Sequence, residues 1–214
     1  FRRFENRKNP NMILVVGGDG SMLHAVRSLW RMRLPFLGVN AGHRGFLLNE
    51  RSELRRLPDT FMAWHLPLLY VEYLTGSGWK SCVAFNDAWV ERKNTQTAWL
   101  RVLINGQARL KRLVADGVLI ATAAGSTAYA RAMGAPPLPV DAAELVLVGS
   151  NVLEPPGWKS AVLAHNSIAE FVAMDPRKRP VSAFADGIPL GEVRAMRVRT
   201  SRIAAAELCF VSGH

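Results

Sequence analysis

The sequence predicts an N-terminal α/β domain followed by a mainly antiparallel β domain, and three observations support this fold class. The apolar run at residues 11–16 ends at a glycine-rich turn at residues 17–20, which is typical of a strand that leads into a helix. A second apolar run at residues 34–39 completes a strand, helix and strand of the kind that forms a parallel sheet. From about residue 66, short apolar runs alternate with turn sequences, which is typical of antiparallel β-structure.

Apolar spacing defines the single long helix that we expect. Leu23, Val26, Trp30 and Leu34 recur at helical spacing, and Ser21 is positioned to serve as the N-cap. The strands expected in the second half lie at residues 68–74, 99–104, 118–122, 144–148, 169–173, 181–184, 196–200 and 207–211. The dipeptide Asn105-Gly106 predicts a tight hairpin after the second of these strands. We therefore expect domains at residues 1–66 and 67–214, with the C-terminal tail able to pack back on the first domain.

Composition limits the class of protein. The chain has 214 residues, 49% of them hydrophobic, which is enough for a sizeable core and excludes a mainly disordered chain. Its apolar runs are far shorter than the ~20 residues that cross a bilayer, so no membrane association is expected. The formal net charge of +10 favours phosphates, nucleotides or nucleic acid as partners. Nucleic acid is not expected, because no recognition motif or aromatic-basic platform accompanies the charge.

Cysteine usage and the N-terminal segment bear on the compartment. Cys82 and Cys209 are the only cysteines, and their spacing suits neither a disulfide framework nor structural zinc. Residues 1–10 are polar and basic and lack the apolar core of a secretory signal. We therefore expect a cytoplasmic protein.

The Gly-Gly-Asp-Gly turn at residues 17–20 is the first candidate site. Glycines between a strand and a helix let the backbone approach a ligand, and the helix N-terminus attracts anions, so the turn suits a phosphate group. The alternative is an ordinary tight turn in which Asp19 caps the helix. The spacing matches neither GxGxxG nor GxxxxGK[ST], so the common dinucleotide and Walker motifs are excluded.

Small and hydroxyl residues form a second candidate site at residues 122–129. After a short strand, they can present N–H and O–H donors to a sugar or base, with Tyr129 as a stacking face or hydroxyl donor. The alternative is a Gly/Ala-rich helix start that packs closely on a sheet. Asn86 offers an amide suited to an adenine edge, and Asp87 a carboxylate suited to ribose hydroxyls, although such a pair alone is more often a turn.

A third glycine-rich loop, at residues 38–46, follows the second strand, where open parallel sheets bind ligands. His43 and Arg44 could contact phosphate there, and a solvated basic loop is the equal alternative. The remaining histidines have no spacing typical of a metal site or catalytic triad. Without a GxSxG motif or an identifiable base, nucleophilic hydrolysis has little support.

In this order, the motifs resemble those of the NAD kinase family over residues 11–200. Residues 17–20 resemble the family's GGDG, residues 40–47 its NxGxLGFL, and residues 86–87 its Asn-Glu pair. Residues 116–129 resemble its DG…TPxGSTAY segment. GGDG is shared with diacylglycerol and sphingosine kinases and phosphofructokinases, whereas the GSTAY segment is much more specific.

Four positions depart from the family pattern. Arg44 replaces a usual Leu, Asp87 a Glu and Ala123 a Pro, and Ala124 stands where a hydroxyl residue is frequent. Asp in place of Glu shortens the reach to a ribose hydroxyl by one methylene. Loss of the Pro loosens the loop backbone.

The resemblance implies a Rossmann-like α/β domain and a β-rich dinucleotide-binding domain that together transfer a terminal phosphoryl group to the 2′-hydroxyl of NAD's adenosine ribose. ATP or polyphosphate would be the donor, Mg²⁺ or another divalent cation the cofactor, and NADP the product, in a homodimer or homotetramer. The metal ligands are not identified. The implied catalytic residue is Asp19, and the implied nucleotide-binding residues are Gly17, Gly18, Gly20, Asn40, Asn86, Asp87, Asp116, Thr127, Ala128, Tyr129 and Asp186. The resemblance implies that Asp116 and Asp186 line the same site, and a contact between subunits is one arrangement that would bring them together.

Two other functions remain open at the level of sequence. A lipid or small-alcohol kinase would share GGDG but would have no reason to keep the GSTAY segment. A catalytically weakened nucleotide-binding relative would fit the substitutions near the site, and it would bind NAD without turnover.

Overall fold

The computed structural model describes residues 9–43, 45–56 and 58–211, which form two compact units. The first unit comprises Phe1–Pro67 and Ile203–His214, and the second comprises Leu68–Arg202. The expectations for residues 1–8 and for Arg44 lie outside the described residues. The predicted domain boundary at residue 66 stays a prediction, because compactness alone does not test independent folding.

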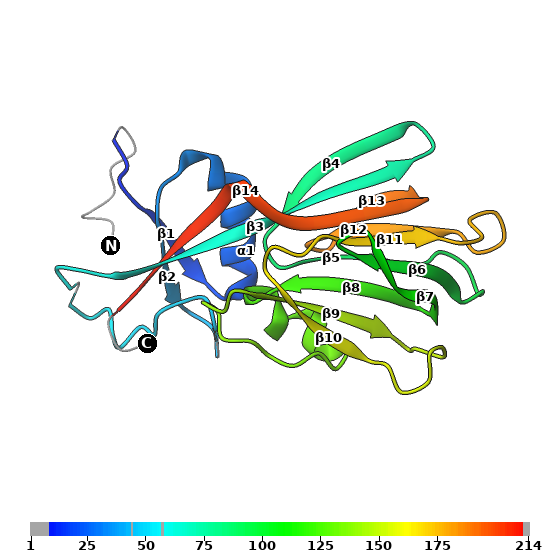
Figure 1. Ribbon diagram of the computed structural model, residues 1–214. Helices are drawn as coiled ribbons and strands as arrows, with labels where there is room; N and C mark the ends of the chain where they lie inside the picture. The colour runs from blue at the N-terminus through cyan, green and yellow to red at the C-terminus, as the bar shows by residue number, and fades with distance from the viewer. Residues whose placement is uncertain (1–8, 44, 57, 212–214) are drawn as a thin grey trace. The chain divides into compact units, whose positions relative to one another are not determined.

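The first unit contains the predicted strand, helix and strand (Figure 1). Strand β1 (Ile13–Gly17) leads into α1 (Asp19–Leu29), the short 3₁₀ helix η2 (Trp30–Met32) and β2 (Phe36–Asn40). β1 and β2 pair in parallel, from Ile13 opposite Phe36 to Gly17 opposite Asn40, and the end of β14 (Ala195–Phe210) pairs in parallel with β2. The α/β class predicted for this part is therefore confirmed.

The helix begins earlier than the sequence predicted. Gly18 is the N-cap, with extended backbone, and α1 begins at Asp19. The N–H groups of Ser21 and Met22 both donate to the carbonyl of Gly18, which places Ser21 inside the first turn. The prediction of Ser21 as N-cap was wrong, because the glycines allow the chain to turn directly from β1 into the helix.

One antiparallel sheet of the second unit has six strands, several of which run side by side in Figure 1. Their order is β10 (Ser160–Ala164), β9 (Glu144–Ser150), β8 (Gly117–Thr122), β5 (Asp87–Arg92), β12 (Val181–Ala185) and β13 (Ile188–Val193). The central strands β8 and β5 pair with Asp87 opposite Ala121 and Glu91 opposite Gly117. This register fixes which ends of the two strands lie together.

The remaining strands of the second unit are also antiparallel. In order they are β7 (Gln107–Ala115), β6 (Ala98–Ile104), β11 (Ala169–Ala173) and β14, and β14 pairs with β3 (Met62–Thr75), which pairs with β4 (Gly78–Ala84). Asn105 and Gly106 have φ angles of 52° and 77° between β6 and β7, which confirms the predicted hairpin. The runs predicted as separate strands at residues 196–200 and 207–211 belong to the single strand β14.

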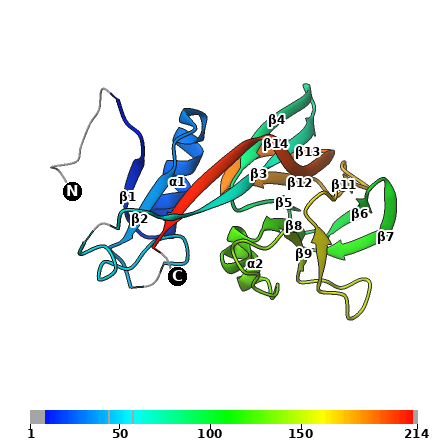
Figure 2. The same cartoon turned by 60° about the vertical axis from the view of Figure 1, so that its left-hand side comes forward.

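A shared core joins the two sheets of the second unit. One buried cluster includes Leu100 and Phe171 from one sheet and Val90 and Ile120 from the other. The opposite face of the six-stranded sheet is covered by the short helix α2 (Tyr129–Ala132), which follows the 3₁₀ helix η3 (Ala124–Thr127) (Figure 2). The segment that resembles GSTAY is therefore packed directly on this sheet.

Within the described ranges, no helix is long and apolar enough to cross a membrane. Neither Cys82 nor Cys209 forms a disulfide.

Candidate active site

Five of the predicted residues lie in the first unit, around the glycine turn between β1 and α1. A Cβ added to Gly17 would lie 2.3 Å from Oγ of Ser21, so this position requires glycine. A Cβ added to Gly18 or Gly20 would meet nothing within 4 Å. The turn therefore presents open backbone at a helix N-terminus, which is the geometry that phosphate groups use.

The Asp19 carboxylate joins this turn to the third glycine loop. Its Oδ2 accepts a hydrogen bond from the N–H of Phe46 at 3.1 Å, and its Oδ1 accepts one from the N–H of Leu47 at 2.9 Å. Asp19 is thus the first helical residue and makes no N-cap bond, contrary to the simple capping alternative. These two bonds fix the orientation of a half-buried carboxylate.

Asn40 and Asn49 hold the loop that begins after β2. The buried Asn40 donates from Nδ2 to Oε1 of Glu50 at 2.9 Å, and its Oδ1 accepts from the N–H of Gly42. Asn49 is fully buried and donates to the carbonyls of Gly38 and Cys209. Asn49 was not predicted as a site residue, although a polar residue after two leucines is a signal for a buried anchor.

Asp186 organises the part of the site in the second unit. Asp186 and Gly187 have φ angles of 48° and 77° in the turn between β12 and β13. The Asp186 carboxylate accepts three backbone N–H bonds, from Phe85 and Asn86 at 2.7 Å and from Asp87 at 3.2 Å. Three donors offset the carboxylate's charge and hold the chain as it enters β5.

Asn86 lies where this chain segment meets the loop that resembles GSTAY. A Cβ added to Gly125 would lie 2.1 Å from the backbone oxygen of Asn86, so only glycine permits this approach. The side-chain Oδ1 of Asn86 is buried and has no hydrogen-bond partner among the described residues. Buried acceptors are normally paired, so this oxygen is an open position for a ligand donor.

Asp87 is a second unusual group, buried beside Asp186. It is 4% exposed, and burial followed by the nearby Asp186 charge raises its pKa from 3.8 to about 7. Such a carboxyl changes charge near neutral pH, and perturbed groups of this kind concentrate at functional sites.

The hydroxyl groups of the loop after β8 mainly hold its own backbone. Thr122 donates to the carbonyl of Phe85 at 2.8 Å and accepts from the N–H of Gly125 at 3.1 Å. Ser126 is fully buried and donates to the carbonyl of Ala123 at 2.7 Å. Thr127 donates to the carbonyl of Ala124 at 3.3 Å. The loop is therefore held in its conformation by its own hydrogen bonds, without a ligand. The residues that follow, Ala128 and Tyr129, lie at the surface.

Tyr129 is 43% exposed and belongs to an aromatic group. Its ring meets Trp89 edge-on at a centroid distance of 5.3 Å, and Trp89 stacks on Phe184 at 4.8 Å. Trp89 and Phe184, which lie opposite each other in β5 and β12, were not predicted as site residues. No local motif marks them, because their contact depends on this strand pairing.

Within one chain, Asp116 lies far from the other predicted site residues of the second unit. It lies before β8, whereas Thr122 and the neighbouring Asn86 lie at the other end of that strand, roughly 20 Å away. There Asp116 pairs with Arg92 at 2.6 Å and accepts from Nδ2 of Asn151 at 2.7 Å. The resemblance implied that Asp116 and Asp186 line the same site, with a contact between subunits as one arrangement. That expectation stays a prediction, because the antiparallel register separates the two residues within one chain.

The described residues contain no group of three or more His, Cys, Asp or Glu side chains that could hold a metal ion. Asp19 has the only carboxylate in the glycine turn, and both of its oxygens accept backbone hydrogen bonds. This arrangement does not suit an all-protein cage. It does suit Mg²⁺ bound mainly by phosphates and water, which needs only one or two protein carboxylates.

Comparison with known sequences extends the resemblance to nearly the whole chain. Residues 2–58 match the family model for the ATP-NAD kinase N-terminal domain. The NAD kinase of Rickettsia canadensis (strain McKiel) is 34% identical over 210 residues, which cover 97% of this chain and 82% of that protein. The NAD kinase of Rickettsia prowazekii (strain Madrid E) is 33% identical over 211 residues, with the same coverage.

Two solved structures share the fold. A yeast NADH kinase complexed with NADH superposes with a TM-score of 0.80 at 21% identity, and the match covers 94% of this chain and 62% of that one. An NAD kinase from Archaeoglobus fulgidus in complex with ATP has a TM-score of 0.78 at 22% identity, with 94% and 78% covered. At these identities the likeness establishes the fold class, an N-terminal α/β part with an antiparallel β part.

Proposed function

This chain belongs to the NAD kinase family, and from that premise we propose that it transfers the terminal phosphoryl group of ATP to the 2′-hydroxyl of the adenosine ribose of NAD, producing NADP. The structural observation that carries the proposal is the fit of the GSTAY-like loop against Asn86. The loop approaches within contact of the Asn86 backbone and leaves the Asn86 Oδ1 acceptor without a partner among the described residues. A kinase that phosphorylates the adenosine ribose needs such a group to bind the adenine base.

The adenosine half of NAD is assigned to Asn86 and Asp87. The Asn86 amide matches the adenine edge, because its oxygen accepts from the exocyclic amine and its nitrogen donates to the ring. Asp87 is assigned to ribose hydroxyls. With a pKa of about 7, its carboxyl either donates to or accepts from a hydroxyl near neutral pH. Asp186 positions both residues through their backbone N–H groups.

The rest of the dinucleotide is assigned to Thr127, Ala128 and Tyr129. The hydroxyl groups of Ser126 and Thr127 are used within the loop, so the surface available to NAD is backbone and the exposed Tyr129 ring. Trp89 and Phe184 support that ring from the sheet. A supported aromatic ring is suited to stacking on a base.

Asp19 is assigned the role of general base. The 2′-oxygen attacks the γ-phosphorus, the bond from that phosphorus to the bridging oxygen of ADP breaks, and the hydroxyl proton moves to the Asp19 carboxylate. The bonds from Phe46 and Leu47 hold the carboxylate in a fixed orientation, which reduces the cost of aligning it in the transition state. Asn40 contributes by holding the loop that supplies these donors.

Gly17, Gly18 and Gly20 are assigned to the phosphates of the donor. Open backbone at Gly18 and Gly20 lets the phosphate oxygens approach the N–H groups at the start of α1. Mg²⁺ or another divalent cation would arrive with these phosphates and offset their charge, with Asp19 the candidate protein carboxylate nearest the turn.

We assign Asp116 to the site of a second copy of the chain, in a homodimer or homotetramer. In its own chain, Asp116 lies at the end of β8 that is remote from Asn86. A second copy of the chain could bring its own Asp116 to this site, as the resemblance implies. We also place the protein in the cytoplasm, where thiols such as Cys82 and Cys209 stay reduced.

The decisive experiment measures NADP formation by the purified chain, with ATP and polyphosphate offered as competing donors. We expect NADP from NAD with ATP and a divalent cation, and no phosphorylation of a panel of diacylglycerol and sphingosine acceptors. Tight NAD binding with no NADP from any donor would instead establish a non-catalytic nucleotide-binding protein. Phosphorylation of the lipid panel alone would overturn the assignment of the acceptor.

A further inference from the structure

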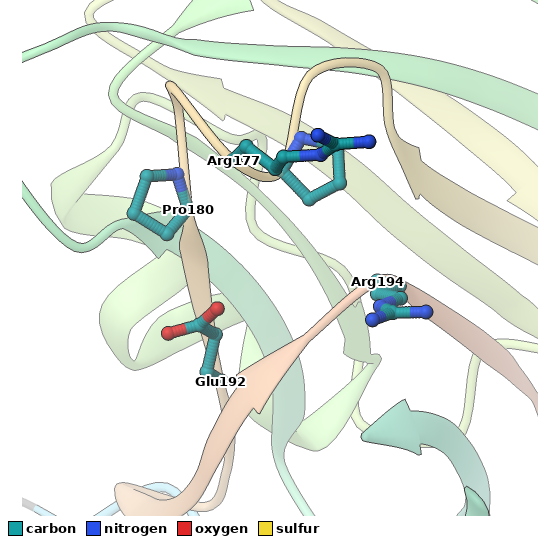
Figure 3. Close-up of a pocket in the computed structure, with 5 residues that line it drawn as sticks. Arg177, Pro180, Glu192 and Arg194 are labelled. Atoms are coloured by element: carbon teal, nitrogen blue, oxygen red, sulfur yellow. The ribbon is translucent and has the colours of Figure 1, made fainter. Parts of the chain in front are cut away.

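A pocket lies in the second unit, away from the residues assigned to NAD (Figure 3). Its volume is about 590 Å³, and it is lined by Pro176, Arg177, Pro180, Glu192 and Arg194. Three of these residues belong to the connection between β11 and β12, and the others lie at the end of β13 and just after it. The volume is in the range of pockets that bind small molecules.

The pocket has an excess of positive charge. Arg177 and Arg194 are exposed, and neither guanidinium has an ion-pair partner in the described part of the chain. The one lining carboxylate, Glu192, is already paired with Nζ of Lys93 at 2.9 Å. In Figure 3 the two guanidinium groups lie on one side of the pocket and the Glu192 carboxylate on the other. An entering anion therefore meets two free guanidinium groups.

The backbone that carries these arginines is fixed before any ligand binds. Arg179, two residues after Arg177, donates from Nη1 to the carbonyl and hydroxyl oxygens of Thr97 at 2.7 and 2.8 Å, and it lies over the Trp99 ring. The N–H of Arg194 donates to the carbonyl of Leu74 at 2.8 Å. Pro176 and Pro180 restrict the backbone on either side of Arg177. Ordering of the loop would therefore cost little on binding.

Strand geometry separates this pocket from the proposed active site. Pro180 precedes β12, and Asp186 follows it, so the strand's five residues place them roughly 15–20 Å apart. A ligand bound at Arg177 would therefore not contact the groups around Asn86.

We propose that this pocket, the Arg177/Arg194 pocket, binds a ligand with two or more linked phosphate groups, at a site distinct from the catalytic one. A guanidinium group binds phosphate oxygens through paired hydrogen bonds, and two such groups on separate fixed segments suit two phosphates of one ligand. Inorganic polyphosphate and nucleoside diphosphates share this chemistry. The inference does not depend on the proposed kinase activity.

The test is calorimetric titration of the full chain with inorganic tripolyphosphate, and with orthophosphate at matched ionic strength. Tripolyphosphate can also occupy the glycine turn, so total binding is not informative. The measured quantity is the change in tripolyphosphate affinity when the pocket arginines are substituted. The double variant Arg177→Ala/Arg194→Ala is expected to weaken one tripolyphosphate site by about tenfold or more and to leave orthophosphate binding weak throughout. Arg109→Ala/Lys111→Ala removes two exposed positive charges from β7 and is the matched control.

Equal weakening in the two double variants would overturn the proposal, because the effect would then be general attraction to a basic protein. Absence of any tripolyphosphate site sensitive to Arg177 or Arg194 would overturn it as well. Circular dichroism checks that each variant is folded, and the single variants decide the question if a double variant does not fold. A parallel titration with ADP distinguishes a nucleotide ligand from inorganic polyphosphate. If the Arg177→Ala/Arg194→Ala variant also loses an ADP site, the ligand is a nucleotide. If ADP does not bind at this pocket in the wild type, the ligand is inorganic polyphosphate.

Discussion

Asp19 combines a structural and a chemical role at a single side chain, and the two can be separated. Replacement by Asn keeps the size of the side chain but removes the proposed base, so we expect kcat to fall by ~10²–10⁴ while NAD affinity changes only a few-fold. One of the bonds from Phe46 and Leu47 is also lost, at about 1–3 kcal/mol of stability. Steady-state kinetics and urea unfolding of Asp19→Asn measure the two effects.

Glu50→Ala is the matched control for Asp19→Asn. It removes the partner of the Asn40 amide in the same loop but leaves the Asp19 carboxylate in place, so kcat should stay close to wild type. If Asp19→Asn retains more than about a tenth of the wild-type kcat, Asp19 is a loop anchor only and the proposed base is wrong.

Asn86 and Tyr129 are predicted to read the dinucleotide and to leave the donor unaffected. Asn86→Ala and Tyr129→Ala should each weaken NAD binding by about 1–3 kcal/mol and ATP binding by much less. Tyr129→Phe keeps the ring against Trp89 and should bind NAD nearly as well as wild type if stacking is the main contact. Calorimetric titration with both nucleotides measures this, and equal losses for NAD and ATP would show that these residues support only the fold.

Asp87 predicts an unusual pH dependence of stability. Its pKa is about 7 in the folded chain against an ordinary 3.8, so between these values the folded chain holds a proton that the unfolded chain has released. The contribution of Asp87 to the free energy of unfolding therefore falls as the pH rises through this window, by roughly 4 kcal/mol at most. The Asn side chain of Asp87→Asn cannot titrate. The free energy of unfolding of this variant, relative to that of the wild type, should therefore increase as the pH rises from 4 to 8.

Urea unfolding of both proteins across that range isolates the contribution of Asp87, because the other titrating groups are common to the two chains. A stability difference between wild type and Asp87→Asn that does not change with pH would contradict the raised pKa.

At the scale of elements, the loop that resembles GSTAY acts through its position on the six-stranded sheet. Gly125→Ala would place a Cβ 2.1 Å from the Asn86 backbone oxygen, so the loop or the start of β5 must move. We expect a stability loss of about 1–3 kcal/mol and at least tenfold weaker NAD binding. Gly76→Ala, in the turn between β3 and β4, meets nothing within 4 Å and should change neither property. Thermal unfolding and NAD titration of both variants provide the comparison.

Local sequence was sufficient for elements whose signals are local. The glycine turn at residues 17–20 and the Asn105-Gly106 hairpin were both predicted from backbone requirements of glycine and asparagine, and both are confirmed. The long strand β14 was predicted as two strands, because the alanines at residues 204–206 have low β-propensity. Pairing with β2 near one end and β11 near the other accounts for the continuous strand.

The arrangement of the second unit's site depends on long-range pairing. Asp186 could be assigned to the site by resemblance, but its bonds to three N–H groups about 100 residues earlier follow from the pairing of β5 with β12. The same reasoning explains why Trp89 and Phe184 were missed. The position of Asp116 also follows from strand geometry, because a motif that continues through a strand has its two parts at opposite ends of that strand.

At the scale of the whole molecule, the remote position of Asp116 predicts that active sites are completed between copies. Asp116→Asn keeps an acceptor for Asn151 but loses the charge that pairs with Arg92, and on this hypothesis it lowers the activity of the homo-oligomer. In a dimer formed from one Asp19→Asn chain and one Asp116→Asn chain, one site has both substitutions and the other has neither. Random mixing of the two chains should therefore restore about a quarter of wild-type activity.

The measurement is NADP formation after the two impaired variants are unfolded and refolded together, with light scattering to determine the number of chains per particle. Refolding each variant separately and then mixing is the control, and it should give no restoration while subunits do not exchange. If co-refolding gives only the average of the two separate activities, Asp116 does not serve a neighbouring site. Its bonds to Arg92 and Asn151 would then be its whole role, as an anchor where β5 and β9 end and β8 begins.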